Sequence, residues 1–131
     1  MMKFKCGTPD AGLLSVRLGL AAVFITHGAM KLATVSATMA MFVKMGLPGW
    51  LGVAVGIAEL LGGAAMLLGV YMKYAGYALA AVMIGAILAV KWKMGFVSGW
   101  EFDFMLLAAA IGMAWTGPGA YAVALPEKMK V

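Results

Sequence analysis

The sequence predicts an all-α fold, a four-helix transmembrane bundle with a short interfacial amphipathic helix between its first and second spans. Of 131 residues, 65% are hydrophobic and only 11% are charged, whereas a soluble domain is about half apolar and a quarter charged. A soluble domain of this size exposes too much surface to hide so much apolar side chain. The length allows one domain, residues 1–131.

Four apolar stretches approach or exceed the roughly 20 residues that a membrane-crossing helix needs. They are residues 11–32, 50–70, 73–92 and 101–116. The segment Leu47-Pro48-Gly49 precedes the second span, and Gly117-Pro118-Gly119 ends the fourth, because this triplet cannot continue a helix. All four tryptophans fall at predicted helix ends, where headgroups satisfy both the ring and its N–H.

Residues 34–46, between the first two spans, show a helical repeat. Val35, Met39, Phe42 and Val43 recur at one face of a helix. This pattern favours a short helix that lies in the membrane interface, with an ordinary structured loop as the alternative.

Small residues at four-residue spacing mark the second span. Gly52 and Gly56 form a G-x-x-x-G pair, and Gly62 continues the pattern from Ala58. Such residues let helix backbones approach closely in lipid. Packing within one bundle is the favoured interpretation, and pairing of two copies, a homo-oligomer, is the alternative.

Composition excludes several function classes. One cysteine, one histidine and five carboxylates leave too few ligands for most metal sites, so no metal and no intrinsic cofactor is predicted. The ten basic residues are scattered, whereas nucleic-acid binders cluster theirs on one face. We therefore expect the basic residues to set topology and to meet membrane lipid headgroups rather than nucleic acid.

Four ionisable residues lie inside the first two spans, namely Arg17, His27, Lys31 and Glu59. A charge at the bilayer centre costs at least about 2.5–3.5 kcal/mol, and such residues by default mark a functional site. At about 100° per residue, the three basic residues share one stripe of the first helix. Glu59 is expected at a depth between Arg17 and His27, where an Arg17–Glu59 ion pair would neutralise both charges.

The roles of these residues follow from their chemistry. His27 and Glu59 are the candidate catalytic residues, since either could relay protons, and histidine is the residue type that changes charge near neutral pH. A hydrogen-bonded contact between helices is the alternative role for His27. Arg17 and Lys31 are candidate ligand-binding residues.

A second polar cluster is expected near the tryptophan-rich interface, with His27 just below it. Its members are Lys31, Lys91, Lys93, Glu101 and Asp103. Glu101 and Asp103 open the fourth span and are further candidate ligand-binding residues, although carboxylates there also complement the helix dipole. Lys91 and Lys93 are expected to extend to lipid headgroups, a mainly structural role.

The chain resembles the DoxX family of small four-span membrane proteins, which is related to the DoxD subunit of thiosulfate:quinone oxidoreductase. The resemblance covers nearly the whole chain and rests on motifs that are weak singly but occur in order. They are Arg17-Leu18-Gly19-Leu20, His27-Gly28-Ala29-Met30-Lys31-Leu32, Met45-Gly46-Leu47-Pro48, Glu59-Leu60-Leu61-Gly62-Gly63, Leu67-Leu68-Gly69, Glu101 and Thr116-Gly117-Pro118-Gly119. The family pattern maps onto Arg17, His27, Lys31, Glu59 and Glu101. The residues after Gly119 depart from it.

The resemblance implies an integral membrane protein that is quinone-linked or redox-associated, with a redox or detoxification protein as partner. A quinone headgroup would be held by His27, Lys31 and Glu101, while His27 or Glu59 relays protons. The alternatives are a non-catalytic membrane scaffold or assembly subunit and a small proton-coupled transporter.

We expect a multi-pass protein of the cell (inner) membrane. Four spans place both termini on the same side. Five lysines lie on that side and four on the other, which favours a cytoplasmic location for both termini.

Overall fold

The computed structural model describes residues 3–123 and 126. Those residues fold entirely into helices and connecting loops, which confirms the predicted fold class. The elements are α1 (Pro9–Ala33), α2 (Val35–Lys44), α3 (Gly49–Leu68), α4 (Met72–Ala86), the π-helical turn η1 (Ile87–Lys91), the 3-10 turn η2 (Trp92–Met94), η3 (Phe96–Trp100) and α5 (Glu101–Thr116). Among the described residues, four helical segments are long and apolar enough to cross a membrane: Pro9–Ala33, Gly49–Leu68, Met72–Met94 and Phe96–Thr116.

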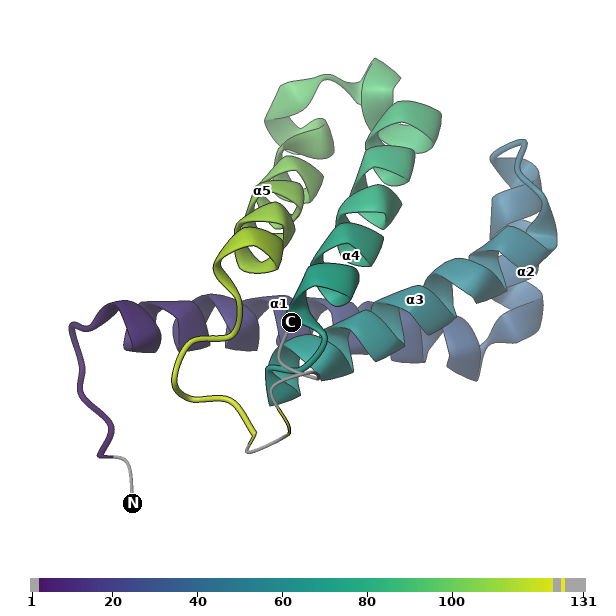
Figure 1. The fold of residues 1–131 in the computed structure, drawn as a ribbon. Coiled ribbons are helices and arrows are strands. Elements are labelled where there is room, and N and C mark those ends of the chain that lie inside the picture. The colour runs from purple at the N-terminus through teal and green to yellow at the C-terminus, as the bar shows by residue number, and fades with distance from the viewer. Residues whose placement is uncertain (1–2, 124–125, 127–131) are drawn as a thin grey trace.

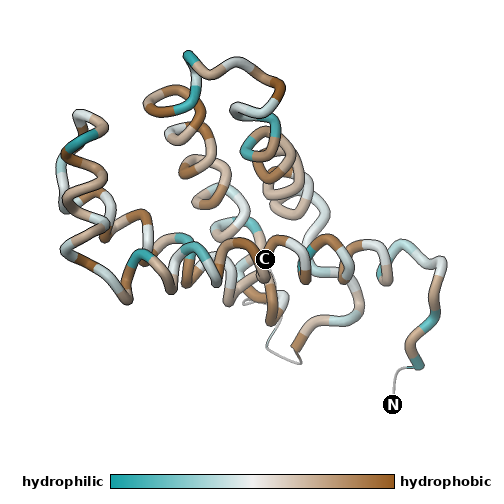
Figure 2. Tube along the Cα trace, turned by 180° about the vertical axis from the view of Figure 1, so that it is seen from behind, coloured by the Kyte–Doolittle hydropathy of each residue, from teal (hydrophilic) through white to brown (hydrophobic). Residues whose placement is uncertain are grey.

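The helices form two antiparallel pairs (Figure 1). Helix α1 packs along α3, α4 packs along α5, and the second pair leans away from the first. Helix α2 folds back against α3 at the far end of the first pair. Hydrophilic positions are few along the four long helices (Figure 2). The core where the pairs meet contains Leu20, Phe24, Met66, Leu79 and Met113.

Glycines fix the register between α1 and α3. A Cβ atom added to Gly28 would lie 2.6 Å from the backbone nitrogen of Leu60, and one added to Gly63 would lie 2.9 Å from that of Ile25. Gly52 and Gly56 are also buried within the chain. The small-residue pattern therefore serves packing inside one chain, as favoured, and association of two copies stays a prediction.

Helix ends lie close to their predicted positions because local signals set them. The Thr8 hydroxyl accepts the N–H of Ala11 at 3.3 Å and caps α1. Gly69, with a φ of 75°, ends α3 in the left-handed conformation that glycine adopts without strain. Gly117 follows the end of α5. The third span differs from a plain helix, since it leaves α-geometry after Ala86.

The predicted short helix after the first span is present as α2. Its protein-facing residues are Thr38 and Phe42, which are buried, whereas Val35, Met39 and Val43 are exposed. The Thr38 hydroxyl donates to the carbonyl of Lys31 at 2.9 Å and ties α2 to the end of α1. That α2 lies in the membrane interface stays a prediction.

The N-terminal segment and the loop that follows α5 lie together. The N–H of Lys5 donates to the Tyr121 hydroxyl at 3.1 Å, and the N–H of Ala120 donates to Asp10 at 2.9 Å. The N–H of Val123 donates to the carbonyl of Leu68 at 2.9 Å. These bonds fasten the loop, residues 117–123, across the ends of α1 and α3.

Candidate functional site

Arg17 does not pair with Glu59, and this corrects the sequence-based prediction. Its guanidinium is buried, with the residue 1% exposed, and within residues 3–123 it donates only to backbone carbonyls. The acceptors are Met66 (2.8 Å) and Leu67 (2.9 Å) on α3, and Pro118 (3.0 Å) and Tyr121 (2.9 Å) in the loop after α5.

The register of α1 against α3 explains this arrangement. Arg17 lies beside Gly69, just past the last turn of α3, where the unpaired carbonyls and the helix dipole attract a cation. Gly28 lies beside Leu60, which places Glu59 near the other end of α1 rather than at an intermediate depth. Arg17 thus joins three segments and lies outside the site described below.

Glu59 forms an ion pair with Lys31. The Lys31 ammonium lies 2.8 Å from one carboxylate oxygen, and the side chains of Glu59 and Lys31 are 5% and 17% exposed. Gly56 permits the contact, because a Cβ there would lie only 3.0 Å from the Lys31 Cβ. The pair links the last turn of α1 to the middle of α3 and neutralises a carboxylate that would otherwise be costly to bury.

The Lys31–Glu59 pair faces a cleft of about 580 Å³ between the two helix pairs. Its lining is mainly apolar and comes from α1, α2, α3, α4, η1 and α5. The polar side chains in that lining are His27, Lys31, Glu59, Lys91 and Asp103. A mostly apolar cavity with a few convergent polar groups is typical of a small-molecule site.

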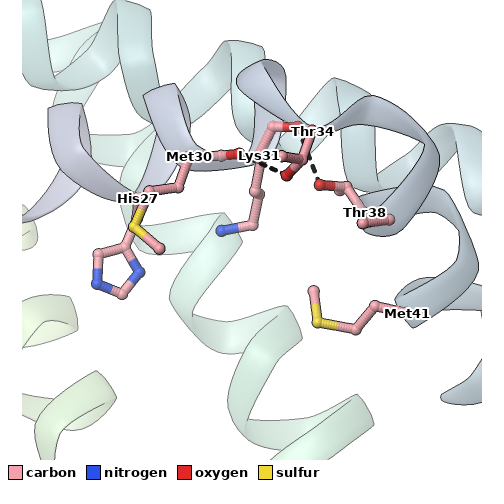
Figure 3. Close-up of a pocket in the computed structure, with 7 residues that line it drawn as sticks. His27, Met30, Lys31, Thr34, Thr38 and Met41 are labelled. Atoms are coloured by element: carbon pink, nitrogen blue, oxygen red, sulfur yellow. Dashed lines mark hydrogen bonds between the residues drawn. The ribbon is translucent and has the colours of Figure 1, made fainter.

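His27 lies at the mouth of this cleft. It is exposed and also lines an outer hollow of about 300 Å³ that shares Lys31 and Met41 with the cleft. Figure 3 shows the His27 ring and the Lys31 amine extending from α1 to the same side, with Met41 of α2 facing them. Within residues 3–123 the imidazole makes no hydrogen bond, so the structure gives no sign of the alternative contact between helices.

A second ion pair lines the same cleft. The Lys91 ammonium lies 2.7 Å from Asp103, whose side chain is 6% exposed against 34% for Lys91. The sequence did not predict this ion pair, and the mainly structural role expected for Lys91 stays a prediction. A π-helical turn ends at Lys91, and such turns are frequent at functional sites. Lys93, two residues later, is exposed and lies outside the cleft.

Glu101 also lies outside the cleft. One of its carboxylate oxygens accepts the N–H of Ser98 at 3.0 Å and so helps to hold the turn before α5, where Ser98 has a φ of 58°. This contact corresponds to the local, helix-terminal role that was the alternative for Glu101.

The structure thus brings together four of the six candidate residues: His27, Lys31, Glu59 and Asp103. It adds Lys91, which was expected in the same interfacial cluster as Asp103 but was not predicted to be a site residue. The signal available was the twelve-residue spacing from Lys91 to Asp103 across a tight connection. Across the part of the chain that the structure describes, no three His, Cys, Asp or Glu side chains come close enough to hold a metal ion.

Comparison with known proteins identifies the family. A Bacillus subtilis (strain 168) protein named "Putative oxidoreductase CatD" is 33% identical over 108 residues, which cover 82% of this chain and 81% of that protein. No solved structure matches the chain significantly. The sequence profile of the DoxX family matches residues 12–92, which hold both residues of the Lys31–Glu59 pair. The chain therefore belongs to the DoxX family of membrane proteins.

Proposed function

We propose that this protein is a membrane subunit of a redox system, and that it binds a quinone in the cleft between its two helix pairs. The observation that carries the proposal is the mainly apolar cleft of about 580 Å³, lined by an ion pair on each helix pair and by His27. A lipid-soluble ring with oxygen atoms matches both the apolar side chains and the charged side chains of the lining. The name of the Bacillus relative supports a role in oxidation–reduction.

Reduction of a quinone takes up two electrons and two protons. In the proposed reaction a partner redox protein supplies the electrons. The residues of this chain bind and orient the ring, and they move protons. His27, which is exposed and lines the cleft with Lys31, bonds to a ring oxygen and exchanges protons with the surroundings. The buried Glu59 orients the Lys31 ammonium at 2.8 Å toward the same oxygen.

Purified protein should bind a short-tailed quinone, 2-decyl-1,4-benzoquinone, in detergent or nanodiscs. Replacing His27 with Leu should weaken binding by about tenfold, because one charge-capable hydrogen bond is lost. Since His27 is exposed and makes no hydrogen bond in residues 3–123, the variant should fold normally. Equilibrium binding by tryptophan fluorescence quenching measures the effect.

Lys44→Gln is the matched control, because Lys44 is exposed and outside the cleft. Unaltered binding is expected for it. Absence of binding to the wild-type protein, or equal binding by the wild type and His27→Leu, would contradict the proposed quinone site.

A non-catalytic scaffold is the second candidate function. One observation favours it. Among the described residues, every buried side-chain nitrogen and oxygen has a hydrogen-bond partner within the protein. In this case the ion pairs only hold the helices, and a partner protein would co-purify with the His27→Leu variant as well as with the wild type. Quinone-dependent electron transfer in the two complexes separates the candidates. Its loss in the His27→Leu complex supports the quinone site, and equal transfer in both complexes supports the scaffold.

We further propose that both chain ends face the cytoplasm. The contact between Lys5 and Tyr121 supports a common side, and Lys3, Lys5 and Lys73 favour the cytoplasm. Cys6 is free and exposed in the N-terminal segment, and it is the only cysteine. A membrane-impermeant maleimide should label Cys6 in inverted vesicles but not in intact cells, with Cys6→Ser as the control; labelling in intact cells would reverse the orientation.

A further inference from the structure

The two ion pairs in the cleft come from different helix pairs. Lys31 and Glu59 belong to α1 and α3, whereas Lys91 and Asp103 belong to η1 and α5. Both ion pairs line the cleft, so the part of its wall that each helix pair forms carries a polar group. Apolar side chains such as Phe24, Val55 and Leu106 make up most of the remaining lining.

Each pair keeps hydrogen-bonding capacity toward the cleft. One oxygen of Glu59 and one of Asp103 accept from a lysine. The second carboxylate oxygen of each residue has no hydrogen-bond partner among the described residues. Every fully buried side-chain oxygen among those residues has a partner, so these two oxygens are not fully buried. These second oxygens therefore keep some accessible surface, and both residues line the cleft. Each lysine has three N–H donors, of which the carboxylate takes one.

Helix stability alone does not account for the second pair. A carboxylate in the first turn of α5 would complement the helix dipole equally well while exposed. Glu101, in the same turn, is less buried than Asp103. Asp103 is instead 4% exposed and turned into an apolar cleft, where a charge is costly unless it is paired. The partner comes from a departure from α-helical geometry, the π-helical turn that ends at Lys91.

From this arrangement we infer that the cleft selects a ring with polar oxygens at opposite ends, one bound by Lys31–Glu59 and the other by Lys91–Asp103. The inference rests on the proposed quinone site and narrows its ligand class to para-dioxygenated rings. Amphiphiles with a single polar end, such as a monophenol or a fatty alcohol, leave one ion pair without a ligand partner. Rings with adjacent oxygens reach only one wall.

Three probes with the same tail test the inference on the wild-type protein: 2-decylhydroquinone, 4-decylcatechol and 3-decylphenol, kept reduced under anaerobic conditions. The hydroquinone should bind about tenfold more tightly than either of the others, because only it engages both walls. This comparison needs no variant. Equal affinity for all three, or a preference for the catechol, would overturn the inference.

The double variant Lys91→Met/Asp103→Leu removes the second ion pair without leaving an unpaired charge. In this variant the hydroquinone should lose its preference and bind only as tightly as the phenol binds to the same variant. Lys93→Met is the matched control, since Lys93 lies outside the cleft, and it should keep the tenfold preference. A preference that persists in the double variant would overturn the inference.

Failure of the inference and failure of the proposed function are distinguishable. If no probe and no quinone binds the wild-type protein, the quinone site itself is wrong. If the quinone binds and His27→Leu weakens it, but the second oxygen and the second ion pair make no difference, only the two-walled selection is wrong.

Discussion

Replacing Arg17 with Met should lower the free energy of unfolding by about 3–5 kcal/mol. The side chain is buried and donates four hydrogen bonds to carbonyls of α3 and of the loop after α5. Without it, buried carbonyl groups lose their partners, at about 1–3 kcal/mol each where water cannot replace the bond. Reversible unfolding in mixed detergent micelles measures the loss.

The Arg17→Lys variant is the informative control. It keeps the positive charge at the end of α3, but it has three N–H donors in place of the planar five-donor guanidinium. An intermediate stability is therefore expected. Limited proteolysis should also cut the 117–123 loop faster in Arg17→Met than in the wild type. A variant with wild-type stability and an uncut loop would show that Arg17 does not hold this end of the molecule together.

For Arg17, the sequence predicted the buried position but not the bonding partners. Hydropathy and turn residues were sufficient to place all four spans and α2, because in lipid a helix must satisfy its own backbone. The cost of burying a charge singled out Arg17 correctly as an inward-facing residue. It could not name the partner, because a guanidinium bonds equally well to a carboxylate and to carbonyls at a helix end.

The pairing of Glu59 depended on the register of two helices, which the sequence did not specify. That register is set by close backbone contact at Gly28 and Gly63, and a shift of a few residues would change which basic residue meets the carboxylate. The Lys91–Asp103 ion pair was not predicted, for a local reason. A π-helical turn changes the face on which later residues lie, and no periodicity of apolar residues indicates where one occurs.

The second large effect is expected at the Lys31–Glu59 pair. Glu59→Leu and Lys31→Met should each lower the free energy of unfolding by about 3–5 kcal/mol, because each leaves one charge in a mainly buried position. The double variant Lys31→Met/Glu59→Leu should lie within about 1–2 kcal/mol of the wild type, since apolar replacement of both partners removes the unpaired charge. Unfolding in mixed micelles gives all four corners of this cycle.

A second cycle separates the observed pairing from the one that the sequence suggested. Arg17→Met and Glu59→Leu should be additive within about 0.5 kcal/mol, because the two side chains share no partner and lie at different levels of α3. The 31–59 cycle should instead show a coupling of several kcal/mol. A strong 17–59 coupling with an additive 31–59 pair would mean that α1 and α3 pack in another register. Glu59 would then be turned away from the cleft, and the proposed quinone site would lack the Lys31–Glu59 ion pair.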